Sequence, residues 1–211
     1  GDNVENGIAV VDVSGSMSGV PMEAAVCMGA YIADKAHGPF ANHFITFSGN
    51  PELVKFEGAD ITDKLVRCIG AKWGANTNIE AVFDMLLKTA MKKSVNPEDM
   101  PSRVYIFSDM EFDECVTSNS SSSGWCFGMN RDSIQTLFEA MKTKWACCGY
   151  KMPSCVFWNL NARNNNIPAI GDGFSYVSGF SPVMIQQILS GKDGLDLILE
   201  KLDSERYAQI H

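Results

Sequence analysis

The feature that most constrains the fold is an apolar segment near the N-terminus that ends abruptly in polar residues. The stretch from Ile8 to Val13 is apolar almost throughout rather than alternating, which is typical of a strand buried on both faces of a parallel sheet. Gly19-Val20-Pro21 then predicts the start of a helix, because proline fits the first helical turn. A buried strand that leads directly into a helix is the usual beginning of an α/β fold.

Strand-like and helix-like segments continue to alternate along the rest of the chain. Short apolar segments bounded by turn residues predict strands, and segments with apolar residues at three- and four-residue spacing predict helices. The predicted strands are His43–Ser48, Leu53–Phe56, Arg103–Phe107, Cys155–Leu160 and Phe174–Val177, and the predicted helices are Pro21–Ala36, Ile61–Ile69, Ile79–Met91, Ile134–Met141, Val183–Leu189 and Leu195–Leu202.

The order of these segments predicts the fold class. Ser48-Gly49-Asn50-Pro51 is a turn between two short strands, so the second of them is expected to be an antiparallel edge strand. The other strands are separated by helices, which indicates parallel pairing. We predict a doubly wound, Rossmann-like α/β fold with a mostly parallel sheet, one antiparallel edge strand and helices on both faces.

The length of the chain predicts one domain. A chain of 211 residues with 45% hydrophobic residues can bury a sizeable core. We expect residues 1–211 to form a single domain, with a flexible loop insertion at residues 113–130 near the site described below. The chain begins with Gly rather than Met, which indicates a domain excised from a longer protein. No apolar run approaches about 20 residues, so neither a membrane span nor a membrane partner is expected.

Charge and cysteine content narrow the function classes further. The formal net charge is −8 at pH 7 and Lys92-Lys93 is the only adjacent basic pair, so direct binding of nucleic acid is not expected. The seven cysteines form no CxxC pair, and Cys27 and Cys155 lie in apolar segments, where a reduced cysteine behaves as a small hydrophobic residue. We therefore expect an intracellular, cytoplasmic protein.

Polar residues follow the predicted strands at the points where these strands end. Asp12, Ser14 and Ser16 form a D-x-S-x-S loop directly after the first strand. Thr77 lies in a Gly-rich segment before a helix, and Asp109 follows a later strand. Because doubly wound sheets bind ligands beyond the carboxyl ends of their strands, we expect these five side chains to converge at that edge.

The chemistry of the five side chains predicts a metal site. Two carboxylates and three hydroxyls, with no histidine or cysteine nearby, select a hard divalent cation, Mg²⁺ or Mn²⁺. Zinc prefers sulfur and nitrogen, and a calcium cage usually gathers more carboxylate and carbonyl oxygens. Gly15 is expected to let the loop turn tightly, and the following helix is expected to direct its positive end toward a bound anion.

The small number of charged ligands indicates binding rather than catalysis. Three of the five donors are neutral hydroxyls, so a bound ion keeps water or an open position that an acidic residue of a protein partner can fill. We therefore predict a metal-dependent protein-binding module and not an enzyme. The alternative is purely local: Asp12 closes the loop, while Ser14, Ser16 and Thr77 cap helices.

The same residues resemble the von Willebrand factor A (vWA) domain family and its metal-ion-dependent adhesion site (MIDAS). That family combines a D-x-S-x-S loop, a threonine in a Gly-rich loop and an aspartate after the fourth strand, which here match Asp12, Ser14, Ser16, Thr77 and Asp109. The resemblance implies that the hydroxyls touch the ion, with the aspartates direct or water-bridged. The family often has T-D-G around the last aspartate, whereas this chain has Ser108-Asp109-Met110.

Longer stretches of the chain resemble an uncharacterised family of plant, fungal and giant-virus proteins, known as a domain of unknown function with a vWA-like C-terminal part. The stretches that carry this resemblance are VVDVSGSM, FSDMEFDE, FWNLNAR and VSGFSP. The Ro autoantigen has a similar A domain beside a separate RNA-binding region, so an accessory domain of a ribonucleoprotein is an alternative function.

A second alternative is an enzyme. An aspartate at the end of the first strand also begins the nucleophile motif of haloacid-dehalogenase-like phosphatases. Those enzymes need an acidic residue two positions later as general acid, and this chain has Ser14 there. The vWA resemblance also implies that the last helix, here Leu195–Leu202, can slide when the metal changes its ligands.

Overall fold

The computed structural model describes residues 6–47, 50–56, 63, 66, 79–109, 131–160, 170–171 and 173–179. The helices and strands given below belong to one compact unit, Asn6–Gly179. The predicted helix Ile61–Ile69 is described only at Asp63 and Val66, which are both helical. Thr77, the loop 113–130 and the helices at Val183–Leu189 and Leu195–Leu202 lie outside the described residues and stay predictions. The single domain over residues 1–211 also stays a prediction.

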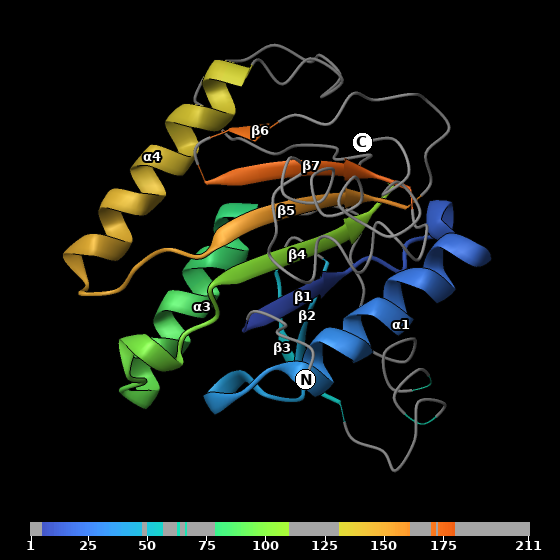
Figure 1. The fold of residues 1–211 in the computed structure, drawn as a ribbon, viewed down its shortest axis with the longest axis horizontal. Coiled ribbons are helices and arrows are strands. Elements are labelled where there is room, and N and C mark those ends of the chain that lie inside the picture. The colour runs from blue at the N-terminus through green and yellow to red at the C-terminus, as the bar shows by residue number, and fades with distance from the viewer. Residues whose placement is uncertain are drawn as a thin grey trace, which may run out of the picture. The chain divides into compact units, whose positions relative to one another are not determined.

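Seven strands of the described residues form one sheet (Figure 1). Their order across the sheet is β3-β2-β1-β4-β5-β7-β6. Neighbouring strands are parallel except at the two edges, where β3 pairs antiparallel with β2 and β6 with β7. The strands are β1 (Gly7–Val11), β2 (His43–Thr46), β3 (Leu53–Lys55), β4 (Arg103–Ser108), β5 (Ser154–Asn159), β6 (Ile170–Gly171) and β7 (Phe174–Ser178).

The predicted fold class is confirmed. The hairpin of β2 and β3 forms the expected antiparallel edge. The sequence did not predict β6, because its two residues, Ile170 and Gly171, are too few to show a periodic pattern. The chain runs from β1 to β2 on one side of the sheet and returns to β4 on the other. β1 and β4 therefore flank the point where the strand order reverses, which is where ligands of such sheets bind.

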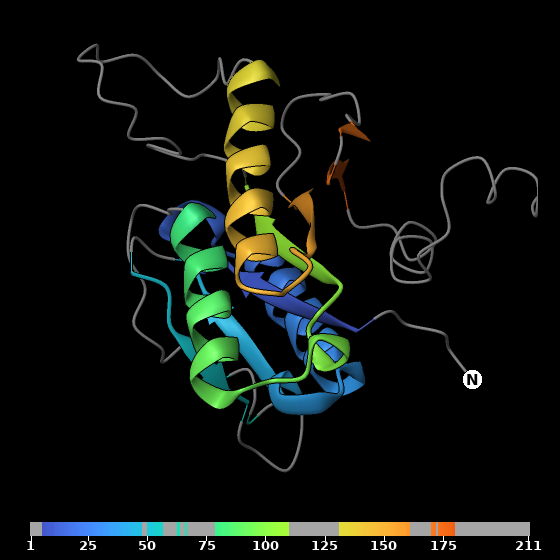
Figure 2. The ribbon, with the colours of Figure 1, turned by 90° about the vertical axis from the view of Figure 1, so that its left-hand side faces the viewer.

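Helices cover both faces of the sheet, with α1 on one face and α3 and α4 on the other (Figure 2). Pro21 lies in the first turn of α1, as predicted. None of the helices in the described part of the chain is long and apolar enough to cross a membrane. The helices are α1 (Val20–Lys35), α3 (Ile79–Lys93) and α4 (Arg131–Cys147), with short 3-10 helices at Gly15–Met17, Gly38–Phe40 and Pro97–Asp99.

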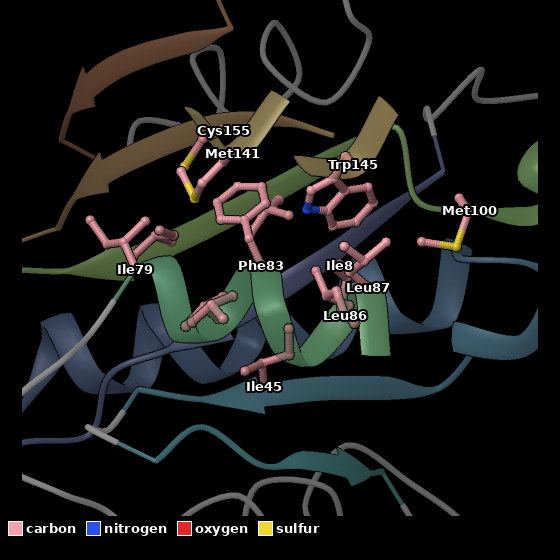
Figure 3. Close-up of a cluster of buried hydrophobic side chains, with 14 of the residues drawn as sticks. Ile8, Ile45, Ile79, Phe83, Leu86, Leu87, Met100, Met141, Trp145 and Cys155 are labelled. Carbon is pink, nitrogen blue, oxygen red and sulfur yellow. The ribbon is translucent and has the colours of Figure 1, made fainter. Parts of the chain in front are cut away.

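The main apolar core lies between the sheet and the helices α3 and α4. β1 contributes Ile8 and Val10 to it, because alternate side chains of a strand face the same side of the sheet. Figure 3 shows Phe83 of α3 beside Met141 and Trp145 of α4. The ring centroids of Phe83 and Trp145 lie 6.3 Å apart with an interplanar angle of 75°, the edge-to-face geometry that aromatic pairs favour. This core holds both helices against the strands whose ends carry the polar residues.

On the other face, α1 approaches β1 very closely. A Cβ atom on Gly29 would lie 2.6 Å from Cγ2 of Val11 and 3.6 Å from Cβ of Ala9. Only glycine leaves room for the helix at this distance, because any other residue places a carbon atom inside the contact radius of the valine. α1 therefore packs directly on the strand that leads to Asp12.

The cysteines in the described part of the chain differ in burial. Cys155 on β5 is fully buried, as expected for a small hydrophobic residue, and burial raises the pKa of its thiol. The same expectation for Cys27 is wrong, because Cys27 is exposed on α1. The apolar neighbours of Cys27 in sequence lie on other sides of the helix, since successive helical residues point in different directions.

Candidate functional site

The ends of β1 and β4 lie side by side and bring their polar residues together. Val11 and Phe107 are register partners, and the Asp12 N–H donates to the Phe107 carbonyl at 3.0 Å. The residues that follow, Asp12 and Ser108, are therefore neighbours although 96 positions separate them in sequence. The predicted convergence of the first strand and β4 is present in the structure, and Thr77 lies outside the described residues.

The carboxylate of Asp12 is buried and held by two donors from different segments. Only 3% of Asp12 is exposed. Its Oδ1 accepts the backbone N–H of Ser14 at 2.7 Å, and its Oδ2 accepts the hydroxyl of Ser108 at 2.8 Å. Each oxygen of this carboxylate retains further lone-pair capacity, so Asp12 is oriented without being saturated.

The charge of Asp12 is costly in this environment. Burial raises the pKa of the Asp12 carboxyl above its usual value, the hydrogen bonds from Ser14 and Ser108 oppose that shift, and the negative charge of Asp109 adds to it. Asp109 follows β4 directly and is itself buried, with 9% of its surface exposed. Two carboxylates that share a poorly solvated site favour a proton or a cation beside them.

Ser14 and Ser16 present their hydroxyls at the solvent side of this site. Their Oγ atoms lie 3.1 Å apart. Ser14 is half-buried and Ser16 is exposed, whereas Asp12 is buried. Positions one, three and five of the D-x-S-x-S loop are thus linked by hydrogen bonds: the backbone N–H of Ser14 donates to Asp12, and the hydroxyls of Ser14 and Ser16 bond to each other.

The helix-capping alternative fails for the serines of this loop. Ser14 precedes the 3-10 helix Gly15–Met17 but makes no side-chain capping hydrogen bond. The residue at the N-cap of α1 is Gly19, which has no side chain and has a φ of 90°. Gly15 was expected to let the loop turn tightly, but a Cβ on Gly15 would meet nothing within 4 Å. The glycine of this loop with a left-handed φ is Gly19.

The site offers oxygen donors rather than a dense group of charged ligands. Within the described ranges, no group of three or more histidine, cysteine, aspartate or glutamate side chains is placed to hold a metal ion. A cation bound at Asp12 and Asp109 therefore needs hydroxyl ligands as well. The D-x-S-x-S loop offers the solvent-side hydroxyls of Ser14 and Ser16, which are oxygen donors of the class that hard divalent cations take.

Two polar residues of the same edge had no predicted role. Ser108 ends β4 and donates to Asp12, and Asn159 ends β5 as the register partner of Ser108. Asn159 is 5% exposed and its Nδ2 donates to the Tyr176 hydroxyl at 3.0 Å. Both are polar residues at the last position of an apolar strand, the same signal that identified Asp12, so this signal could have been applied to every strand.

Comparison with known proteins identifies the family. Residues 6–209 match the family model described as "Domain of unknown function (DUF7788)". The chain belongs to this family. It is also similar to "Uncharacterized protein L728" of Acanthamoeba polyphaga mimivirus, with 33% identity over 192 residues, covering 89% of this chain and 31% of the viral protein. The family assignment agrees with the resemblance found in the sequence and names no activity.

One solved structure supports the fold. The crystal structure of the RO (RSR) protein of Deinococcus radiodurans matches with a TM-score of 0.55 at 15% sequence identity, over 91% of this chain and 35% of that protein. Proximal thread matrix protein 1 from the mussel byssus matches with a TM-score of 0.42 at 13% identity, over 93% of this chain and 48% of that protein. The chain spans only about a third of the length of the viral relative and of the bacterial structure.

Proposed function

We propose that this chain is a metal-dependent protein-binding module. In this proposal a Mg²⁺ or Mn²⁺ ion, held by Asp12, Ser14, Ser16, Thr77 and Asp109 in the manner of a vWA domain with a MIDAS, accepts a carboxylate from a partner protein. The observation that carries the proposal is the pair of solvent-facing serine hydroxyls, 3.1 Å apart, in a loop whose Ser14 backbone N–H donates to the buried Asp12 carboxylate.

The described residues fit such an ion in spacing and charge. Adjacent ligands of an octahedral ion with metal–oxygen distances of about 2.0–2.1 Å lie about 2.8–3.0 Å apart, which is close to the 3.1 Å between the Ser14 and Ser16 Oγ atoms. A divalent cation also favours the ionised form of Asp12, which burial and the negative charge of Asp109 otherwise disfavour. Thr77 enters the ligand set through the vWA resemblance alone.

The exposure of the donors favours a binding role. Asp12 and Asp109 are buried, whereas Ser14 and Ser16 can be reached from solvent. A partner therefore approaches the ion from the serine side. When bound, the ion supplies a positive charge that attracts a carboxylate oxygen, the ligand type that hard cations prefer. A phosphatase role is less well supported, because Ser14 occupies the position of the general acid.

The metal part of this proposal is tested by titration calorimetry with Mg²⁺ and with Mn²⁺. We expect the wild-type protein to bind, and Ser14→Ala and Ser16→Ala to bind at least tenfold more weakly. Ser18→Ala is the matched control, because its exposed hydroxyl lies two residues further on and donates only to the Gly15 carbonyl at 2.7 Å. Equal affinity in all four proteins would contradict the proposed ligand set.

The partner part is tested with displayed peptides selected on the wild-type protein in Mg²⁺. The enriched peptides should contain Asp or Glu, should lose binding in EDTA, and should lose binding when that residue is changed to Asn or Gln. Turnover of p-nitrophenyl phosphate in the same Mg²⁺ buffer, abolished by Asp12→Asn, would instead favour the phosphatase alternative.

A further inference from the structure

We propose that Ser108 is a positioning residue that sets the cation selectivity of this site by fixing how the Asp12 carboxylate meets the ion. The inference rests on the metal site proposed above. It concerns a residue outside the D-x-S-x-S loop and outside the five expected ligands.

The position of Ser108 gives it a controlled geometry. Ser108 is the last residue of β4, it is fully buried, and its hydroxyl donates to Asp12 Oδ2 at 2.8 Å. The surrounding backbone cannot shift easily, because β4 pairs with β1 on one side and with β5 on the other. The Ser108 hydroxyl is therefore a rigid donor that meets a buried acceptor from a separate strand.

As a consequence, each of the two carboxylate oxygens of Asp12 accepts a hydrogen bond from a different segment of the chain. The Ser14 N–H holds Oδ1 at 2.7 Å while Ser108 holds Oδ2. A carboxylate held in this way cannot rotate freely to place both oxygens on one ion. It can offer one oxygen, or a bridging water, to a cation on the serine side.

This restriction separates two classes of hard cation. Ca²⁺ takes six to eight oxygen ligands and frequently uses a carboxylate through both oxygens, whereas Mg²⁺ takes six ligands, retains water readily and uses single carboxylate oxygens. Ser108 thus disfavours the larger ion by keeping Asp12 from two-oxygen ligation. The groups that orient metal ligands typically change metal affinity by about 10–100-fold when they are removed.

The test measures Mg²⁺ and Ca²⁺ dissociation constants by calorimetry for the wild type, Ser108→Ala and Ser108→Cys. The cysteine variant leaves no cavity, because its thiol is slightly larger than the hydroxyl, but the thiol is a weak donor. It therefore still tests the proposal if the alanine variant folds poorly. Ser102→Ala is the matched control, because the Ser102 hydroxyl lies at the opposite end of β4 and donates to the Asn6 carbonyl at 2.9 Å. Thermal melting in EDTA reports the effect of each variant on stability.

We expect Mg²⁺ affinity to fall about 10–100-fold in both Ser108 variants, and Ca²⁺ affinity to fall less, so that the ratio of the Ca²⁺ to the Mg²⁺ dissociation constant drops. Ser102→Ala should keep the wild-type ratio. If Ser108 has a purely structural role, the variants should have a lower melting temperature and should bind both ions more weakly by the same factor. An unchanged ratio of the two dissociation constants would overturn the inference. A wild-type protein that binds neither ion would overturn the proposed metal site itself.

Discussion

The contact between Gly29 of α1 and Val11 of β1 yields a quantitative prediction for Gly29→Ala. The added methyl carbon would lie 2.6 Å from Cγ2 of Val11, a distance that requires one of the two elements to move. Val11 is fully buried, and its strand is paired on both sides, to β2 and to β4. Valine is also stiff at χ1, so the strain falls on the position of α1.

Two opposing terms determine the magnitude. Alanine favours a helix over glycine by about 0.8–1.0 kcal/mol. Inserting a methyl group into a closely packed core costs about 1–3 kcal/mol, and the rigid surroundings of Val11 place this case in the upper part of that range. We therefore expect a net loss of about 1–2 kcal/mol, which lowers the melting temperature by about 2–8 °C in a domain of this size.

The assay is a double-mutant cycle by urea denaturation with Gly29→Ala, Val11→Ala and the double variant. Val11→Ala alone should cost about 2–3 kcal/mol, from lost burial and a partly unfilled cavity. In the double variant the clash is absent, so it should be more stable than the sum of the single effects predicts, by about 1–3 kcal/mol. Gly15→Ala, whose Cβ would meet nothing within 4 Å, should change stability by less than about 0.5 kcal/mol. Additivity of the two core substitutions within about 0.5 kcal/mol would refute the reasoning.

Three further predictions follow from polar groups of the described residues. In EDTA, Asp12→Asn should raise the melting temperature at pH 7. Because the folded pKa of Asp12 lies above 3.8, the stability that Asp12 contributes is complete below that pH and is lost as the pH rises through the folded pKa. The melting temperature should therefore fall less steeply from pH 3 to 8 in the variant than in the wild type. Asn6→Ala should cost about 1–3 kcal/mol in urea denaturation, because the buried Asn6 accepts the His37 N–H at 3.2 Å and its loss leaves that donor without this partner; no change would show that water replaces it. Asp84→Ala should cost less than about 1 kcal/mol despite its 2.6 Å ion pair with Lys144, whose side chain is 48% exposed, and a larger loss at high salt would contradict this.

The fold class was predictable because it depends on local apolar patterns. A strand such as β1, buried over its whole length, needs a continuous apolar run, and a helix such as α3 needs apolar residues at helical spacing. Both patterns can be recognised in the sequence alone. The short β6 carried no such pattern, and the exposed side of α1 at Cys27 could not be distinguished from its buried side.

The candidate site was predictable in part for a topological reason. Parallel strands place their carboxyl ends at the same edge of a sheet, so Asp12 and Asp109 had to come close once β1 and β4 were neighbours. The role of Ser108 could not be derived in this way, because a hydrogen bond depends on register and on distances of a few tenths of an ångström.

The sequence by itself determined that this chain forms an alternating α/β sheet and that one loop of carboxylate and hydroxyl donors lies at its carboxyl edge, because burial patterns and strand direction are local properties of the chain. Only the tertiary structure decided that Asp12 is buried between Ser14 and Ser108, and that α1 rests on β1 through Gly29. The contacts of Ser108 and Gly29 join different strands and helices, and their energies depend on solvent exclusion and close packing, which arise only when the strands and helices come together.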